Sequence, residues 1–409
     1  MRRELTASAP TQASSVDAKR GRGWRGAGTL VARGVLALAL LASALLSLTP
    51  TGRAATRAAL LLPALVDAIE PAPLLIAGDP IRHTQTAVVS RDGAVYLDIY
   101  APTTPTPAVP GAREGLLLIP GVGDNRAVPQ LVNLAQSLAR SGIVAMAMTT
   151  DTLISYELAP TTIDAVVAAT LALQRYPGVG PGHVGIIGFS AGGSLGALAA
   201  ADPRIRDALA FALSFGGYYD ATSLLRELGQ RALPVGGKLV PWQPDPVPVQ
   251  TLTNTLGQVL PASDRTLLSS GFNIVNGVEL SPADQARLSP AGQAAYHLVT
   301  GDQPDRVDAN LAALPPEARP LLVALSPSAV VARLHAPIYL LHDQSDIYVP
   351  FTQSRDFAAA LARIAHPHKF VEFSIFQHVE VKSGLGVGQM LRDGWSLYLV
   401  LLAALAPAA

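Results

Sequence analysis

A serine flanked by glycines, Gly188-Phe189-Ser190-Ala191-Gly192, is the stretch of this sequence best suited to chemistry. A short apolar run precedes it and a run of small residues follows to Ala201, which predicts a strand, a tight turn and a helix. The glycines fit the pattern G-x-S-x-G, in which a serine sits on a strained turn without room for neighbouring side chains. We therefore expect the Ser190 hydroxyl to be exposed above a sheet, where the first helical amides face whatever it attacks.

Such a serine needs a buried sheet beneath it, and the chain supplies alternating strands and helices. Apolar runs predict five strands, namely Leu116–Ile119, Ile143–Met148, His183–Phe189, Ala208–Phe215 and Pro337–Leu341. The continuous run Leu116–Ile119 is typical of a strand buried on both faces. A hairpin precedes them (Thr84–Ser90 and Ala94–Tyr100), a strand follows them (Lys369–Phe376), and helices are expected near Pro129–Ser141, Thr161–Tyr176 and Thr352–Ile364. This alternation predicts an α/β fold with a doubly wound, mostly parallel sheet.

The alternation stops between Gly216 and Arg333. Five prolines in Leu233–Val249 argue against a helix or a central strand there, and residues 250–325 resemble short helices separated by Ser-Pro and Pro-Pro. Apolar residues stay frequent, which favours an inserted helical cap or lid at 217–333 over disorder. The two flanking segments, 81–216 and 334–409, form the predicted core, and the apolar Trp395–Leu405 is expected to be a last helix packed on the sheet.

The N-terminus has the pattern of a membrane-targeting segment. Residues 1–33 form a basic tail with seven Lys or Arg and two acidic residues, and the apolar segment 34–50 follows. A basic flank before an apolar run is typical of a signal anchor or a signal peptide, with the positive side inside. We expect a catalytic domain anchored on the extracytoplasmic side of a membrane, or secreted if the signal is cleaved. Residues 51–80 are interpreted as a linker that includes a juxtamembrane helix.

Composition excludes several classes of function. The net charge is zero, which argues against nucleic acid as a general partner. The absence of cysteine removes disulfides, thiolate metal sites and cysteine nucleophiles. Proline separates the histidines in His366-Pro367-His368 and no carboxylate spacing supports a metal pair, so we interpret this motif as a loop. We expect neither a metal nor a cofactor.

Several motifs together resemble the α/β-hydrolase superfamily, within it the branch of serine esterases, dienelactone-hydrolase-like and prolyl-oligopeptidase-like enzymes. The resemblance covers about residues 84–216 and 326–405. It depends on five motifs in order, which are Tyr96–Pro102, Gly121-Val122-Gly123, Gly188–Gly192, Asp346 with Val349-Pro350, and His378. The order Ser…Asp…His is the one that this fold uses.

The resemblance implies a role for each residue. Ser190 would be the nucleophile, His378 its base, and Asp346 the acid that orients the imidazole; Asp343 is a rival for the acid. The amides of Val122 and Ala191 would form the oxyanion hole, although Pro120-Gly121 stands where many members of the family have His-Gly. Ser194 is expected to pack inside the elbow helix, and Tyr218-Tyr219-Asp220 is a candidate pocket lining.

The expected activity is hydrolysis of a carboxylic ester, or of a thioester or amide, through an acyl-enzyme intermediate. The substrate would be a small ester or a lipid-like molecule, because a cap suggests a covered apolar pocket. Two alternatives stay open. A serine peptidase of the prolyl-oligopeptidase-like type would want an additional propeller domain, and a catalytically silent binding protein would usually lack a member of the triad. The sequence does not define the oligomeric state.

Overall fold

The computed structural model describes residues 49–66, 71–105, 109–275, 277–378, 380–381 and 386–406. The chain divides into two compact units, Met1–Thr56 and Arg57–Ala409. The first unit contributes to the described part only residues 49–56, where helix α2 (Pro50–Val66) begins. The predicted basic tail 1–33 and nearly all of the predicted apolar segment 34–50 lie outside the described residues. Among the helices that are described, none is both long and apolar enough to cross a bilayer.

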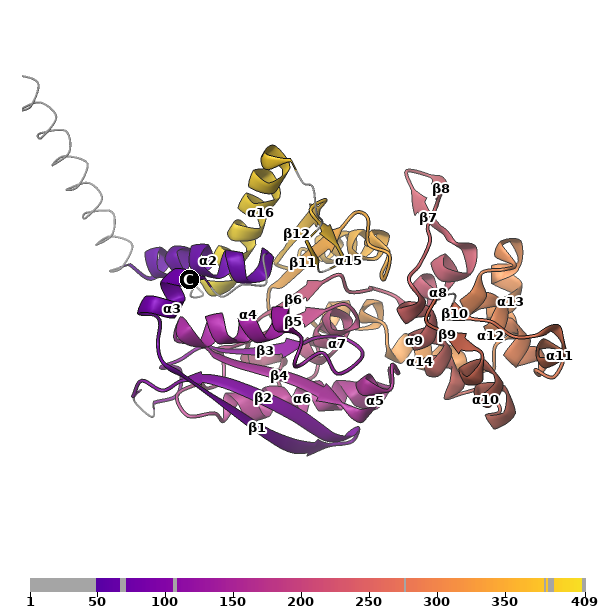
Figure 1. Ribbon diagram of the computed structural model, residues 1–409, viewed down its shortest axis with the longest axis horizontal. Coiled ribbons are helices and arrows are strands. Elements are labelled where there is room, and N and C mark those ends of the chain that lie inside the picture. The colour runs from indigo at the N-terminus through magenta and orange to yellow at the C-terminus, as the bar shows by residue number, and fades with distance from the viewer. Residues whose placement is uncertain are drawn as a thin grey trace, which may run out of the picture. The chain divides into compact units, whose positions relative to one another are not determined.

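A mostly parallel sheet forms the centre of the second unit, as the sequence predicts (Figure 1). In the described residues it has eight strands in the order β1-β2-β4-β3-β5-β6-β11-β12. Their bounds are β1 Ile81–Ser90, β2 Gly93–Pro102, β3 Gly115–Ile119, β4 Val144–Thr150, β5 Val184–Phe189, β6 Leu209–Phe215, β11 Ile338–Asp343 and β12 His368–Phe373. Strand β2 is antiparallel to β1 and β4, and the other neighbouring pairs are parallel.

Helices cover both faces of this sheet. Figure 1 shows α4 (Pro129–Arg140) on one side and α6 (Pro160–Gln174) on the other, with the short α5 (Asp151–Ile154) between them in sequence. The remaining helices of the core are α7 (Ala191–Ala200), α15 (Phe351–Arg363) and α16 (Val387–Leu405). Helix α16 begins eight residues before Trp395, where the sequence predicted its start. The first two turns escaped prediction because they contain Gly388 and expose most of their side chains, so no pattern of buried residues marks them.

A mainly helical insertion joins β6 to β11 and lies at one end of the sheet (Figure 1). Its helices are α8 Ala221–Gln230, α9 Pro246–Gly257, α10 Ala262–Ser270, α11 Pro282–Gln285, α12 Pro290–Thr300, α13 Val307–Ala313 and α14 Ala318–Ala324, followed by the 3₁₀ turns η3 Pro327–Ala329 and η4 Val331–Arg333. It also contains the hairpin β7 (Ala232–Val235) and β8 (Lys238–Pro241) and the short pair β9 (Phe272–Asn273) and β10 (Gly277–Val278). The helix α9 corrects our interpretation of the proline-rich stretch: Pro246 and Pro248 stand in its first turn, where an amide needs no helical partner.

The segment predicted as a linker, 51–80, is helical over much of its length. After Arg57, α2 continues to Val66, and α3 spans Ala72–Ala77. Leu61 is almost fully buried, and Arg57 forms an ion pair with Glu114. The amide of Asp79 donates to the carbonyl of Arg140. Residues 57–66 and 71–79 therefore contact the core of the second unit, to which they belong.

Candidate active site

Ser190 lies on the turn between β5 and α7 in a strained backbone conformation. Its φ is +53° and its ψ is −136°, a combination that L-residues rarely adopt. A Cβ on Gly188 would stand 2.2 Å from the carbonyl oxygen of Gly192, and a Cβ on Gly192 would stand 2.3 Å from that of Ile119. Both positions therefore require glycine. The Ser190 amide donates to the carbonyl of Phe215 at 2.8 Å, which holds the turn against β6.

His378 and Asp346 form a buried hydrogen-bonded pair. Asp346 follows β11, and His378 follows the short strand β13 (Phe376–Gln377), which pairs with β14 (Glu380–Val381). Nδ1 of His378 donates to Oδ2 of Asp346 at 2.6 Å. The ring of Tyr348 stacks on the imidazole with 4.6 Å between ring centroids. Asp346 thus holds the imidazole at Nδ1, and Tyr348 covers one face of the ring. The other ring nitrogen, Nε2, can bond to a further group.

The carboxylate of Asp346 is surrounded by donors. Oδ1 accepts from the amides of Tyr348 at 2.7 Å and Val349 at 3.0 Å. Nε2 of His342 lies 3.3 Å from Oδ2. Burial alone would raise the pKa of Asp346, but the charge on His378 and the hydrogen bonds from both histidines outweigh it and hold that pKa well below its usual range. The carboxyl is therefore ionised at neutral pH.

A backbone link brings this pair close to Ser190. Phe215 accepts the hydrogen bond of the Ser190 amide, and the next residue, Gly216, lies against the pair. A Cβ on Gly216 would stand 3.1 Å from Nδ1 of His378 and 3.3 Å from Oδ2 of Asp346. No hydrogen bond joins the Ser190 hydroxyl to the His378 ring, although both residues are described. In enzymes, the hydrogen bond between a nucleophile and its base is often long without substrate and shortens in complexes.

The loop Gly121-Val122-Gly123 passes directly over the serine. A Cβ on Gly121 would stand 3.3 Å from the Cβ of Ser190. The amide of Gly123 is occupied, since it donates to the carbonyl of Leu153 at 2.7 Å. Among the residues that the structure describes, the amides of Val122 and Ala191 have no acceptor within the chain. These two amides are available to a ligand oxygen beside Ser190.

Asp343, the rival acid, fastens the two loops that carry the pair. Its Oδ1 accepts from the amide and the hydroxyl of Ser345 at 2.7 and 2.6 Å, and its Oδ2 accepts from the amide of Phe376 at 2.8 Å. Ser345 precedes Asp346, and Phe376 stands two residues before His378. Asp343 therefore connects the turn after β11 to the turn after β12.

The other candidates from the sequence have structural contacts. The hydroxyl of Ser194 is buried and donates to the carbonyl of Tyr218 at 2.7 Å, and the ring of Tyr219 stacks on Phe357. Asp220 caps α8 by accepting from the amide of Ser223 at 2.9 Å. In the loop before β12, His366 Nε2 contacts the carbonyl of Ala336. His368 is the first residue of β12 and so lies outside the predicted loop, and its Nδ1 contacts the carbonyl of His366.

Sequence reasoning missed two groups near this site. His342 is fully buried, with Nδ1 at 2.7 Å from the Ser354 hydroxyl and Nε2 at 2.9 Å from the carbonyl of Val349. Glu227 accepts from Thr352 at 2.7 Å and Gln353 at 2.8 Å, and burial raises its pKa to about 7. The position of His342, four residues before Asp346, was the available signal for the first group. No sequence signal marked Glu227, because its hydrogen-bond partners Thr352 and Gln353 lie on α15, far away in the sequence.

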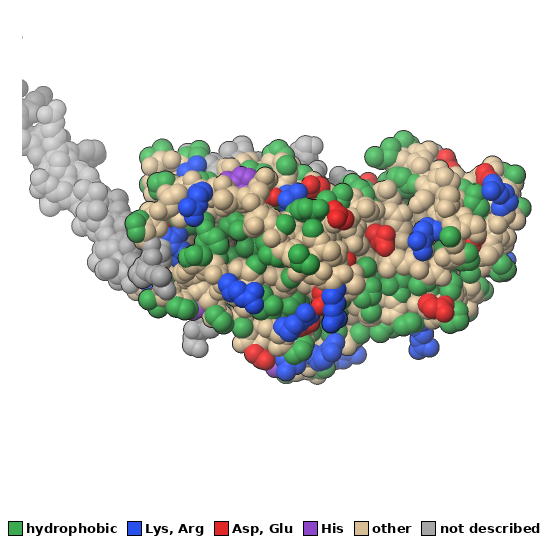
Figure 2. Space-filling model, turned by 90° about the horizontal axis from the view of Figure 1, so that it is seen from below, with side chains coloured by type: hydrophobic (Ala, Val, Ile, Leu, Met, Phe, Trp, Pro, Cys, Tyr) green, Lys and Arg blue, Asp and Glu red, His purple; other side chains and the backbone are tan. Residues whose placement is uncertain are grey.

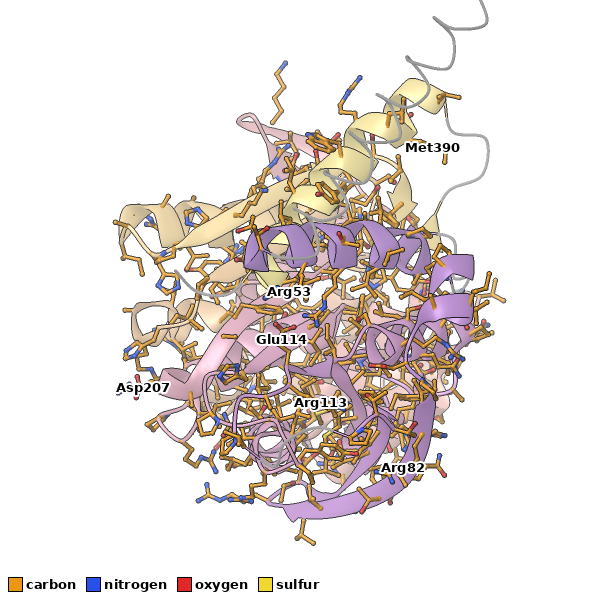
Figure 3. All side chains as sticks on the ribbon, turned by 90° about the vertical axis from the view of Figure 1, so that its left-hand side faces the viewer. Arg53, Arg82, Arg113, Glu114, Asp207 and Met390 are labelled. Carbon is orange, nitrogen blue, oxygen red and sulfur yellow. The ribbon has the colours of Figure 1, made fainter. Side chains whose placement is uncertain are left out.

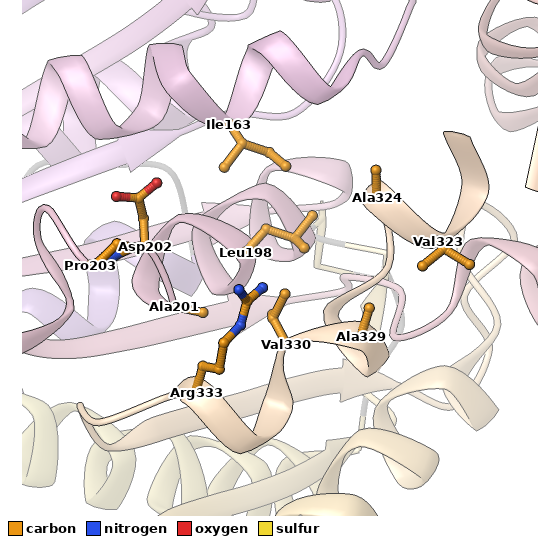
Figure 4. A pocket seen from close by; sticks show the side chains of 10 residues that line it. All are labelled: Ile163, Leu198, Ala201, Asp202, Pro203, Val323, Ala324, Ala329, Val330 and Arg333. Atoms are coloured by element: carbon orange, nitrogen blue, oxygen red, sulfur yellow. The ribbon is translucent and has the colours of Figure 1, made fainter. Parts of the chain in front are cut away.

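A cavity of about 370 Å³ lies elsewhere, between α6, the end of α7, α14 and the two 3₁₀ turns (Figure 4). Its lining is mostly apolar, with Asp202 and Arg333 as the charged side chains. None of the predicted site residues contributes to it. The cavity is therefore separate from the group around Ser190.

The arrangement of these elements identifies the family that the chain is similar to. A strained serine follows a central parallel strand, and the acid and the histidine follow two later strands at one side of the sheet. The chain resembles the α/β-hydrolase superfamily. No family model matches the sequence, and no curated protein matches it.

The chain is also similar to several solved structures. Dipeptidyl peptidase 4 from Porphyromonas gingivalis is 12% identical with a TM-score of 0.45, over 80% of this chain and 36% of that chain. A puromycin-hydrolyzing peptidase from Mycobacterium tuberculosis is 17% identical with a TM-score of 0.46, over 80% of this chain and 41% of that chain. Est1E from Butyrivibrio proteoclasticus is 13% identical with a TM-score of 0.45, over 79% of this chain and 99% of that chain. This chain thus spans less than half the length of the two peptidases.

Proposed function

We propose that this α/β-hydrolase-like chain is a serine hydrolase that cleaves a carboxylic ester through an acyl-enzyme intermediate. The observation that carries the proposal is the hydrogen bond between His378 and Asp346. Both side chains lie against Gly216, and the residue before it, Phe215, accepts the hydrogen bond of the Ser190 amide. A serine hydroxyl is a weak nucleophile until a neighbouring base takes its proton. The pair supplies that base in a fixed orientation.

In the proposed reaction Ser190 Oγ attacks the ester carbonyl carbon while Nε2 of His378 takes the hydroxyl proton. The amides of Val122 and Ala191 donate to the resulting oxyanion, and each such donor contributes about 10²–10³ in rate. The C–O bond to the alcohol then breaks, and His378 returns the proton to the leaving oxygen. Water, deprotonated by His378, then attacks the acyl carbon; the bond from that carbon to Ser190 Oγ breaks, His378 returns the proton to Oγ, and the acid leaves. Asp346 keeps Nδ1 protonated, so that Nε2 can accept in each half of the cycle.

A substrate panel tests the reaction and its bond preference. The full chain should hydrolyse p-nitrophenyl acetate and butyrate, with kcat/KM well above that for aminoacyl p-nitroanilides. Ser190→Ala should lower ester turnover by about 10³-fold or more, whereas Ser194→Ala should retain it. Faster cleavage of the anilides would support the peptidase alternative, and undiminished turnover by Ser190→Ala would contradict a serine mechanism. Turnover of acetyl esters only would exclude a lipid-like acyl group.

We also propose that residues 34–50 anchor the chain in a membrane, with the catalytic unit on the extracytoplasmic side. The basic tail and the uncharged run Gly34–Leu48 support this. Alkaline extraction of membranes from expressing cells should leave the full chain in the pellet and should release a variant with Leu38→Arg and Leu41→Arg. Release of the full chain itself would contradict an anchor.

A further inference from the structure

The first half of α16 exposes an apolar stripe. Val387, Leu391 and Trp395 follow one another at intervals of four residues, so they share one face of the helix, and they are 73%, 69% and 61% exposed. The opposite face is buried through Leu397 and Val400. Met390 lies at the same outer end of α16, where Figure 3 labels it. Bulky apolar side chains gathered in this way on a soluble surface usually mark a contact site.

A second apolar projection stands on the same side of the unit. In the β7–β8 hairpin, Gly236 and Gly237 form the turn at positive φ, and Leu239 and Val240 are 62% and 43% exposed. The hairpin and the outer end of α16 both reach the upper side in Figure 1, and they do so again in Figure 3, which is turned about the vertical axis. The two projections therefore point in a common direction.

The charges on these projections are basic. Lys238 and Arg392 are exposed, and within 232–241 and 386–398 the acidic residue is Asp393. Asp393 is buried and accepts from the amide and the hydroxyl of Ser374. By contrast, the face seen from below carries both basic and acidic side chains (Figure 2). Apolar side chains with basic neighbours suit a lipid bilayer, which has an apolar interior and anionic headgroups at its surface.

Each projection is fastened to a loop of the candidate active site. Trp242, directly after β8, donates from Nε1 to the carbonyl of Asp346 at 2.9 Å. On α16, Gln389 donates to the hydroxyl of Ser374 at 2.7 Å, beside the bonds to Asp393. Ser374 stands four residues before His378. A surface that held both projections would therefore hold the loops of Asp346 and His378 next to it.

We propose that Lys238–Val240 and Val387–Trp395 form a docking surface for an anionic lipid bilayer. A lipid surface is the occupant that suits an apolar stripe with a tryptophan and basic neighbours, and the sequence already predicts that residues 34–50 keep the chain at a membrane. The docking surface places the loops that carry Asp346 and His378 beside the bilayer. It does not rest on the proposed hydrolysis, and its test does not use turnover.

The chain has no cysteine, so single cysteines can report contact at chosen positions. Leu239→Cys, Leu391→Cys and the control Val89→Cys, each in the full chain, are labelled with the fluorophore NBD. Val89 lies on β1 and is 87% exposed. Vesicles of phosphatidylcholine with phosphatidylglycerol are then added. The emission at 239 and at 391 should rise about twofold or more with a blue shift, as expected when a probe enters the acyl boundary, and the emission at 89 should not change.

Other results would overturn the docking surface. No rise at 239 or 391, or a rise at all three positions, would exclude a specific lipid contact even if residues 34–50 bind the vesicles. A rise without vesicles that depends on protein concentration would assign the surface to a second copy of the chain. In the NBD-labelled Leu391→Cys protein, Lys238→Ala with Arg392→Ala should raise the lipid concentration at half-maximal emission by roughly fivefold per basic side chain. An unchanged lipid concentration would contradict the role of charge.

Discussion

At the scale of single residues, the site depends on which ring nitrogen of His378 carries the proton. An ionised carboxylate can only accept hydrogen bonds, so Asp346 at 2.6 Å fixes the proton on Nδ1. The charge on His378 and the hydrogen bonds from His378 and His342 hold the pKa of Asp346 low and keep this carboxyl ionised. With the Nδ1 proton held by Asp346, Nε2 is the ring nitrogen that can exchange a proton with a serine hydroxyl.

Asp346→Asn should reverse this arrangement. If the asparagine oxygen stays on the amides of Tyr348 and Val349, its NH₂ group faces Nδ1 of His378 and moves the imidazole proton to Nε2. We expect kcat to fall by about 10⁴-fold, measured with p-nitrophenyl esters on protein that circular dichroism shows to be folded. Asp343→Asn is the control, because Asp343 holds the amides of Ser345 and Phe376. It should lower the free energy of unfolding by about 1–3 kcal/mol and affect kcat far less. Equal losses of kcat would contradict the assignment of the acid.

At the scale of elements, the turn between β5 and α7 depends on close contacts between backbone segments. Gly188 and Gly192 leave no room for a Cβ because the atoms opposite are backbone carbonyl oxygens, that of Gly192 in α7 and that of Ile119 at the end of β3. Gly196, one turn further along α7, faces side chains instead: a Cβ there would stand 2.9 Å from Cγ2 of Ile186. Side chains can shift by a few tenths of an ångström, whereas the backbone of the elbow cannot do so without moving Ser190.

The pair Gly188→Ala and Gly196→Ala tests this distinction. Gly188→Ala should destabilise the protein by about 3 kcal/mol or more, because overpacking against backbone displaces the turn. Gly196→Ala should cost less, about 1–2 kcal/mol, because the contact is with one side-chain methyl group that must shift and the gain in helix propensity offsets part of that cost. Urea denaturation of both variants measures the difference. Similar costs for the two substitutions would contradict the packing described for the elbow.

At the scale of the whole molecule, one buried carboxyl links the insertion to the core and makes stability depend on pH. Glu227 on α8 accepts hydrogen bonds from Thr352 and Gln353 on α15, and burial raises its pKa to about 7 from the ordinary value of 4.5. Between these two values the folded state keeps a proton that the unfolded chain has lost. The free energy of unfolding therefore falls as the pH rises through this window, by about 3 kcal/mol in total.

Glu227→Gln removes this ionisation and keeps a neutral side chain of the same shape. Relative to the parent, the variant should gain about 3 kcal/mol in free energy of unfolding between pH 5 and pH 8. Urea denaturation of both proteins at the two pH values gives the comparison. If the difference between variant and parent is the same at pH 5 and pH 8, Glu227 does not titrate in this range in the folded protein.

The sequence was sufficient where the signal is local. Continuous apolar runs located the parallel strands, and the spacing of Gly188, Ser190 and Gly192 located the elbow, because both patterns reflect contacts within a few residues. The resemblance to a family directed attention to Asp346 and His378, which the structure brings together. Asp343 shows the limit, since two acidic residues three positions apart cannot be distinguished until the partners of each are known.

Contacts between distant segments could not be predicted in this way. His342 reaches Asp346 only because the chain turns back after β11, and Glu227 meets Gln353 across 126 positions of sequence. The first turns of α16 escaped prediction because their apolar side chains face outward, whereas periodicity arguments assume that such residues are buried. In each case the decisive information is three-dimensional.

The most direct test of the central claim is active-site labelling with a fluorophosphonate, which reacts with an activated serine. The full chain, Ser190→Ala and His378→Ala are treated alike, and the adduct is located by mass spectrometry of peptides. The account predicts one adduct per chain on Ser190 in the parent and none in either variant. A folded parent that takes up no label, or label on a serine other than Ser190, would contradict the account.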